Sequence, residues 1–186
     1  MDHGGSAPLR LPGEVLATRR TRLRRLQRDD VPALCAILSD RRVMRYSLRG
    51  PCDEVATSAF VEECLAIYER FGYGPWAVVH PVSLSLMGFC GIGPERVGGD
   101  EEMSLGYRFA VRHWSRGIAT EVAGAVTAYA FSATSLTSLV AVVEPGNIAS
   151  WRVLEKIGFL FEGEAEFHRR RVSVYRRHRY QDVTCQ

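Results

Sequence analysis

One stretch of this chain combines the residue types that bind a phosphate group through the main chain. Its sequence is RHWSRGIATE, at residues 112–121, and it lies between a strand-like run and an apolar helical run that continues to about Thr134. The first turn of a helix carries backbone N–H groups without internal partners and partial positive charge. Gly117 and Ala119 have little or no side chain, so an anion can approach the backbone closely.

This pattern predicts a loop that grips a phosphorylated cofactor, although an ordinary capped helix start has a similar composition. The amides of residues 115–120 are the predicted donors, and Arg116 adds positive charge. The predicted cofactor contacts in this part of the chain are Arg112, Ser115, Arg116, Gly117, Ile118, Ala119 and Thr120.

A second group of polar residues stands where an apolar strand passes into a short helix. Asn147 follows Pro145 and Gly146 at the predicted helix start, and Ser150 lies three residues further on. Asparagine is a good helix cap, and position 150 then lies on a neighbouring helical face. Arg152 on the same helix either reaches a phosphate or is an ordinary surface charge.

Hydrophobic periodicity and turn signals define the elements that must position these groups. Predicted strands cover residues 20–26, 76–81, 84–92, 103–110 and 138–145, and a final hairpin within 159–183 turns near 168–171. Predicted helices cover residues 31–40, 53–71, about 118–134 and 147–156. The order β-α-α-β-β-β-α-β-α-β-β indicates a mixed sheet with helices packed on it. Gly106 suggests a bulge in its strand. Aromatic residues predicted to fill the core are Trp76, Phe89, Tyr107, Phe131 and Phe159.

Length and composition indicate one globular domain. The chain has 186 residues, of which 46% are hydrophobic and 24% charged. Residues 1–17, rich in Gly and Pro, are predicted to be a flexible tail, and residues 18–186 a single domain. No long apolar run predicts a membrane span. The five cysteines are odd in number and scattered, which favours a cytoplasmic setting, and neither they nor the five histidines have the spacing of metal ligands.

Three segments together resemble one known family. Residues 114–119 (WSRGIA) resemble the Q/R-x-x-G-x-G/A loop of the GNAT acyl-CoA N-acyltransferases. Residues 147–159 (NIASWRVLEKIGF) are similar to the N-x-x-S-x-R-x-x-E-K-x-G-F segment of the branch that contains the ribosomal-protein N-terminal acetyltransferases. Residues 18–26 resemble the opening T-x-R-L-x-L-R-x-L of that branch, with Thr21 in place of Leu. The implied fold is α/β (α+β), with a mixed, mostly antiparallel sheet of about seven strands flanked by about four helices.

The resemblance implies an acetyltransferase that moves the acetyl group of acetyl-CoA to a primary amine in a ternary complex, without a metal. Two strands splay apart, and the pantetheine arm pairs with main chain at Phe109, Ala110 and Val111. A main-chain N–H near Arg108 or Phe109 polarises the thioester carbonyl. By resemblance Ser150 hydrogen-bonds the departing sulfur, Asn147 contacts pantetheine or acceptor, and Arg152 reaches the adenosine phosphates. The tyrosine that usually acts as the acid is replaced by Leu154.

The general base and the acceptor stay open. In the family a glutamate often stands two residues before the strand glycine, where this chain has Ser104, so Glu102 on the same strand face is the candidate substitute. Glu162 and Glu164 are other candidates, and a water chain suffices for an α-amine. Tyr46 is a candidate to line the acceptor pocket. The acceptor is a small-molecule amine or a protein N-terminus, and the protein is a monomer or homodimer.

Two further functions compete with catalysis. Of the 23 arginines, six lie between Arg19 and Arg28 and six between Arg169 and Arg179. Such clusters suit a nucleic-acid-binding module, but Arg20, Arg22 and Arg24 alternate as on a solvated sheet face, so we do not expect nucleic acid to be the partner. Ser104 and Leu154 also allow a CoA-binding sensor that has lost catalysis.

Overall fold

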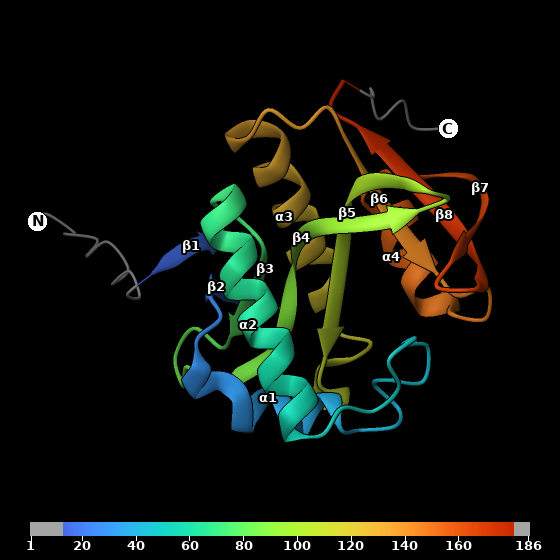
Figure 1. Cartoon of the computed structure of the whole chain (residues 1–186). Coiled ribbons are helices and arrows are strands. Elements are labelled where there is room, and N and C mark those ends of the chain that lie inside the picture. Colours follow the sequence, from blue (N-terminus) through green and yellow to red (C-terminus); the bar gives the residue numbers. More distant parts are fainter. Residues whose placement is uncertain (1–12, 181–186) are drawn as a thin grey trace, which may run out of the picture.

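The computed structural model describes residues 13–180, which form an eight-stranded open sheet with helices on both faces (Figure 1). The strands are β1 (Glu14–Ala17), β2 (Arg22–Arg25), β3 (Pro75–Val79), β4 (Leu86–Val97), β5 (Asp100–Phe109), β6 (Ser138–Val143), β7 (Leu160–Phe167) and β8 (Arg170–His178). The helices are α1 (Val31–Leu38), α2 (Glu54–Phe71), α3 (Ile118–Ala133) and α4 (Ile148–Lys156), with short 3-10 turns at Arg28–Asp30 and Val111–His113. This is the mixed, mostly antiparallel sheet with four helices that the sequence predicts, with eight strands where about seven are expected.

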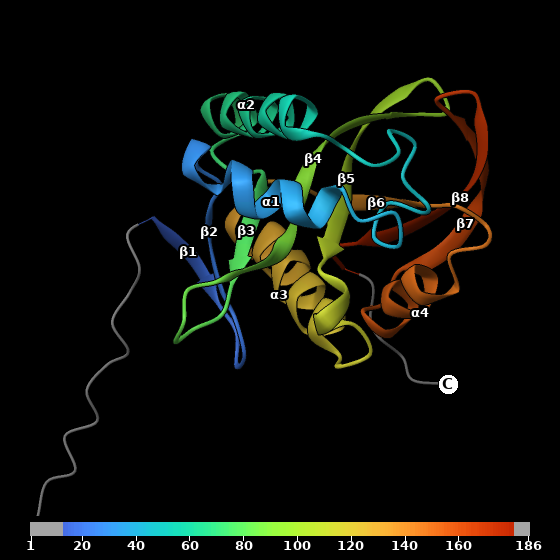
Figure 2. The ribbon, with the colours of Figure 1, turned by 90° about the horizontal axis from the view of Figure 1, so that it is seen from below.

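The sheet has the strand order β1-β2-β3-β4-β5-β6-β8-β7. Neighbouring strands are antiparallel except β5 and β6, which are parallel because α3 connects them by a crossover. Figure 2 shows α1 and α2 on one face of the sheet and α3 on the other. The loop between α1 and α2 reaches across the first face towards β6 and β8 (Figure 2).

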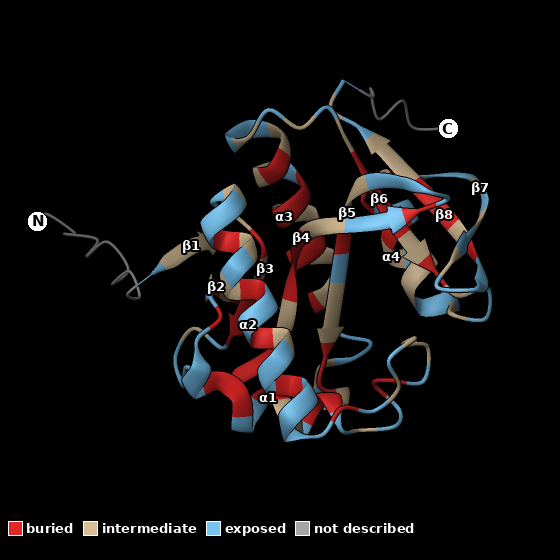
Figure 3. Ribbon diagram, in the orientation of Figure 1, coloured by how far each residue is buried: buried red, intermediate tan, exposed pale blue. Residues whose placement is uncertain are grey.

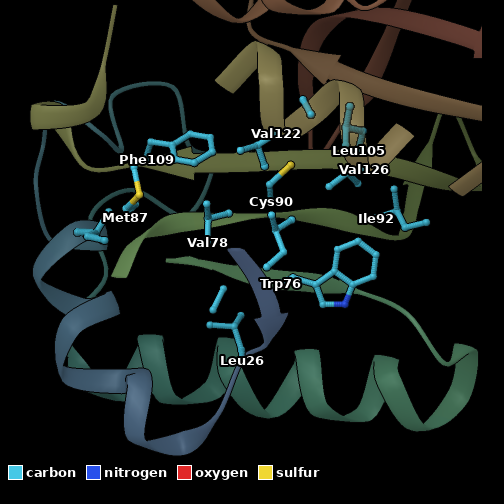
Figure 4. Close-up of a cluster of buried hydrophobic side chains, with 14 of the residues drawn as sticks. Leu26, Trp76, Val78, Met87, Cys90, Ile92, Leu105, Phe109, Val122 and Val126 are labelled. Atoms are coloured by element: carbon cyan, nitrogen blue, oxygen red, sulfur yellow. The ribbon is translucent and has the colours of Figure 1, made fainter. Parts of the chain in front are cut away.

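The core lies on both faces of the central strands. Figure 3 shows buried residues concentrated in β3, β4 and the inner sides of the helices. Figure 4 shows Trp76, Cys90 and Ile92 between α2 and α3, and all three are fully buried. The strands at the centre are apolar on both faces because helices cover both sides, and this burial fixes the register of β4 and β5.

Local sequence signals place the ends of α2 as predicted. The carboxylate of Asp53 accepts a hydrogen bond from the amide of Ala56 at 2.8 Å, which caps the first turn. Gly72 ends the helix with φ +79°, a left-handed conformation that glycine adopts without a steric penalty. The structure therefore confirms this helix and its two boundary residues.

Three details differ from the sequence-based expectations. Residues 14–17, predicted to belong to a flexible tail, form β1 and pair with β2, whereas residues 1–12 lie outside the described part. The β4–β5 hairpin extends beyond the predicted strand ends, to a two-residue turn at Gly98 and Gly99. No bulge occurs at Gly106, since the β4–β5 register is continuous from Gly88–Phe109 to Val97–Asp100.

The strands β5 and β6 meet at one end and separate at the other. Within the described residues they are in register at a single pair, Ser104 and Val140. Near this closed end, Arg176 on β8 donates to the carboxylate of Glu102 on β5 at 2.7 Å and to that of Glu162 on β7 at 2.8 Å. These ion pairs link β5 to the two last strands across β6. Beyond this pair, the edges of β5 and β6 that face each other have no strand pairing within the described residues.

Candidate active site

The loop before α3 presents a concave group of free amides. Within the described chain, none of the six amides from Ser115 to Thr120 donates a hydrogen bond, and the next one, Glu121, donates to the carbonyl of Gly117 at 3.0 Å. Ser115 and Gly117 have positive φ angles, +57° and +72°, on either side of Arg116. Alternation of left- and right-handed residues turns successive amides towards one point, which is the geometry of an anion-binding nest.

An arginine braces this loop from the N-terminal strands. The Nη1 of Arg20 donates to the carbonyl of Arg116 at 2.6 Å, and its Nε donates to the carboxylate of Glu121 at 2.7 Å. Arg20 therefore joins the loop to the first turn of α3. It also neutralises the carboxylate that would otherwise oppose an anion at this helix start.

Two residues just before the nest make contacts within the protein. Arg112, predicted to contact a cofactor, donates to the carbonyl of Leu86 at 3.1 Å and to the ring of His113 at 3.1 Å. The indole of Trp114 donates to the carbonyl of Phe109 at 2.8 Å. This bond holds the loop against the end of β5.

The register decides which backbone amide faces the gap between β5 and β6. Ala110 donates to the carbonyl of Met87 at 2.9 Å, so its amide points to β4. Amides along an antiparallel pair alternate in direction, so that of Arg108 also points to β4 and that of Phe109 points into the gap. Of the two donors left open by the sequence, the geometry thus favours Phe109. The main chain of Ala110 is occupied, since its carbonyl accepts from His113.

The start of α4 faces β5 across this gap. The side-chain oxygen of Asn147 accepts from the amide of Ser150 at 3.2 Å, so Asn147 is the helix cap that its residue type suggests. The hydroxyl of Tyr107 lies 3.0 Å from the Oγ of Ser150 and 3.2 Å from its carbonyl oxygen. Burial raises the pKa of Tyr107 to about 12, an effect that its bond to Ser150 opposes. Tyr107 therefore stays a neutral phenol at physiological pH.

Sequence reasoning assigned Tyr107 to the core and missed this contact. The available signal was its place one residue after Gly106, on the strand that borders the gap, but the partner is 43 residues away. Arg152, by contrast, is exposed and stacks over the ring of Trp151, with 5.6 Å from guanidinium carbon to ring centroid. No contact of Arg152 within the described residues decides between a phosphate ligand and an ordinary surface charge.

A cavity of about 530 Å³ opens on the α1–α2 face, beside the gap. Gly93 and Gly106 leave part of its lining without side chains, and a Cβ on Gly106 would meet nothing within 4 Å. Its walls come from α2, the loop at residues 44–52, the turn between β7 and β8, and the separating ends of β5 and β6. Tyr46 lines it, and the position of a Cβ on Gly146 would lie 3.4 Å from the Tyr46 ring. Tyr46 therefore borders a pocket, and its contact with an acceptor stays a prediction.

Most carboxylates near the site are held by arginines. Glu102, predicted as a base, binds Arg176 and is absent from the cavity wall, which argues against that role. Glu162 binds the same arginine, and Glu164 pairs with Arg171. Sequence spacing did not show these pairs because both arginines lie on β8, far along the chain.

One cavity carboxylate has no such pair. Glu63 binds Arg49 and Glu144 binds Arg170, but Glu95 makes no ion pair within the described residues. Burial raises the pKa of Glu95, and the nearby positive charges of His168 and Arg49 oppose that rise. A raised pKa makes a carboxylate a stronger base, as proton abstraction requires.

The arginine clusters are largely neutralised in the same way. Ion pairs in the first cluster join Arg20 to Glu121, Arg22 to Glu14, Arg24 to Asp30 and Arg28 to Glu62. Those of the second join Arg170 to Glu144, Arg171 to Glu164, and Arg176 to Glu102 and Glu162. Ion pairs therefore hold seven of the twelve clustered arginines, so the clusters offer phosphates less charge than the sequence alone indicates.

No group of three or more His, Cys, Asp or Glu side chains is placed to hold a metal ion within residues 13–180. Among the described helices, none has the length and apolarity needed to cross a bilayer.

The fold and this site together define an acetyltransferase. Residues 20–160 match the family model described as an acetyltransferase (GNAT) domain, and the chain belongs to that family. The uncharacterized protein YkkB of Bacillus subtilis (strain 168) is 33% identical over 166 residues, which cover 89% of this chain and 96% of that protein. The crystal structure of an acetyltransferase from Agrobacterium tumefaciens C58 is 30% identical, with a TM-score of 0.77 over 94% of this chain and 99% of that one.

More distant structures share the fold. RimL, a ribosomal L7/L12 α-N-protein acetyltransferase in complex with coenzyme A, is 17% identical, with a TM-score of 0.72 over 89% of this chain and 97% of that one. The aminoglycoside acetyltransferase AAC(6')-Ib, also in complex with coenzyme A, is 14% identical, with a TM-score of 0.69 over 86% and 95% of the two chains. The match of the family model confirms the family that the sequence motifs predict.

Proposed function

We propose that this protein transfers the acetyl group of acetyl-CoA to a primary amine by direct attack in a ternary complex. The observation that carries the proposal is the gap between β5 and β6 beyond Ser104 and Val140, which has the free amides of the nest at one end and the cavity on one face. RimL and AAC(6')-Ib, which share the fold, bind coenzyme A. A cytoplasmic setting is part of the proposal, since the four described cysteines are free thiols.

The nest positions the donor. Amides of residues 115–120 hold the diphosphate of acetyl-CoA, and Arg20 keeps them in place by binding the carbonyl of Arg116. The pantetheine arm then lies along β5 in the gap, where Phe109 offers an outward amide. This amide donates to the carbonyl oxygen as negative charge develops on it, and one such donor contributes about 2.7–4 kcal/mol to transition-state stabilisation.

The acceptor amine enters from the cavity. Its nitrogen forms a bond to the carbonyl carbon, the carbon–sulfur bond breaks, and the electron pair of that bond leaves on sulfur. Glu95 takes the proton of the amine through a chain of waters, because it lines the same cavity and has no ion-pair partner within the described residues. The thiolate takes a proton from solvent.

Ser150 and Tyr107 assist the leaving group without giving up a proton. A thiol has a pKa of about 8.5, so its thiolate is too weak a base to deprotonate a phenol with a pKa of about 12. In this proposal the phenol hydrogen of Tyr107 turns from the carbonyl of Ser150 to its Oγ, which leaves the serine O–H free to donate to sulfur. Tyr107 is therefore a positioning residue. It brings a phenol to the site although Leu154 occupies the position of the family's usual tyrosine.

A screen of amines tests the proposed activity. The protein is incubated with acetyl-CoA and a panel of small amines and N-terminal peptides. Release of free thiol and the mass gain of one acetyl group on the amine are then measured. We expect thiol release that depends on an amine and a matching mass gain. Tight CoA binding without thiol release from any amine would favour the inactive sensor, and retention of nucleic acid at low salt that is lost at high salt would favour the nucleic-acid module.

A further inference from the structure

Arg108 differs from the other arginines of the cavity because no carboxylate in the described residues neutralises it. Arg49 and Arg170 line the same cavity, and each is bound to a glutamate, Glu63 at 3.0 Å and Glu144 at 3.1 Å. The ionisable groups that interact with Arg108 are the phenol of Tyr107 and the thiol of Cys52. Both groups are neutral at physiological pH. The cavity therefore contains one guanidinium without a counterion.

Its position is fixed beside the reacting atoms. Arg108 precedes Phe109 on β5, and its Nη1 donates to the carbonyl of Tyr107 at 2.8 Å, at the edge that faces the gap. A guanidinium has five N–H donors, so others remain for a ligand. Burial lowers the pKa of Arg108, yet arginine stays protonated in proteins. A partly buried charge without a partner costs free energy that an anion from a ligand would recover.

We propose that Arg108 binds an anionic group of the acceptor, a carboxylate or a phosphate that lies close to the attacking amine. This inference rests on the proposed function and specifies its acceptor. Glu144, on the other strand of the gap, does not fill this role because Arg170 holds it. The cavity volume of about 530 Å³ suits a small molecule, and a planar guanidinium matches the oxygens of either anion.

Matched acceptor pairs test the role of the anion. Glycine is compared with glycinamide, and O-phosphoethanolamine with ethanolamine, which separates a carboxylate from a phosphate. For each acceptor, kcat/KM of the wild type is divided by that of Arg108→Gln, so that differences in amine basicity cancel. We expect this ratio to be about 10–100 for an anionic acceptor, the value of a lost charge-assisted hydrogen bond, and within about threefold of one for its neutral partner.

Arg49→Gln is the matched control. It removes the same charge from the same cavity, but from an arginine that Glu63 already binds. A general electrostatic effect would raise the kcat/KM ratio equally for both variants. A direct contact would raise it for Arg108→Gln alone. Arg108→Lys keeps the charge and should restore part of the loss. Calorimetric binding of CoA to each variant checks that the fold is intact.

The outcomes separate this inference from the proposed function. Neutral acceptors used as well as anionic ones, or equal losses in Arg108→Gln and Arg49→Gln, would overturn the role of Arg108 and leave the acetyltransferase activity standing. An absence of thiol release with every amine, neutral or anionic, would overturn the proposed function itself.

Discussion

Ser104 on β5 lies opposite Val140 on β6, and this register pair marks the point at which the two strands separate. Arg176 holds the closed side by binding Glu102 and Glu162. On the open side, Arg108 and Glu144 each stand four residues beyond the pair, and both line the cavity. A sheet that is pinned at one point and open beyond it offers unpaired main chain to a ligand, as an edge strand does.

Gly117→Asp should abolish the binding of CoA. Gly117 has φ +72° at the start of α3, so a side chain is strained there, and a carboxylate beside the nest repels a diphosphate. We expect the calorimetric Kd to rise by at least about 100-fold. Gly13→Asp is the matched control, because Gly13 has φ +70° and open space around it. Equal CoA affinity in both variants would contradict the assignment of the nest.

Tyr107→Phe should lower kcat by about tenfold while the affinity for CoA stays the same, because the phenol only positions Ser150. Ser150→Ala should lower kcat by at least as much. The double variant should be little worse than Ser150→Ala, since both changes remove one interaction. Losses that multiply would show that the two residues act independently. The wild type should show no alkaline decline due to Tyr107 up to about pH 10, given its pKa of about 12.

Glu95→Gln should lower kcat/KM by about 100-fold and remove an acidic limb from its pH profile. A base acts when deprotonated, so activity falls as the pH drops through the folded-state pKa of Glu95. Burial raises that pKa, which places the limb at higher pH than for an ordinary glutamate. The decline caused by protonation of the amine itself remains in both proteins.

Glu102→Gln is the control for that prediction, because its carboxylate is held by Arg176. We expect it to lower the free energy of unfolding by about 1 kcal/mol, as for a partly exposed ion pair, with kcat nearly unchanged. If Glu102→Gln instead abolishes activity and Glu95→Gln does not, the base stands on β5, as the sequence pattern predicts.

Gly106→Val should raise the KM for the acceptor by at least about tenfold without unfolding the protein. A Cβ at Gly106 meets nothing within 4 Å, so the new side chain enters the cavity, and a β-branched residue suits a strand. Gly91→Ala is the contrast, since its Cβ would lie 2.2 Å from the carbonyl oxygen of Gly74 and should destabilise the fold. A thermal melt and acceptor kinetics on both variants measure this difference.

Much of the fold was predictable because its signals are local. The four helices and the strands from β2 onward follow from periodicity, caps and turn residues, as Asp53 and Gly72 show for α2. The strand β1 was missed because four residues after a glycine carry little signal, and its stability comes from pairing with β2. Glycine in a strand was likewise ambiguous. Gly106 lines the cavity and makes no bulge. Its role depends on the residues packed around it, which the sequence alone does not show.

The sequence by itself determined the family, the order of the elements from β2 onward and the place of the nest, because these depend on residues close together in the chain. Only the tertiary structure decided which charges are available for chemistry. Glu102 and Glu95 look alike in the sequence, yet one is held by Arg176 on β8 and the other faces the cavity. Ion pairs such as this join residues far apart in the chain, so the free carboxylate, the unpaired Arg108 and the contact of Tyr107 with Ser150 appear only once the sheet is assembled.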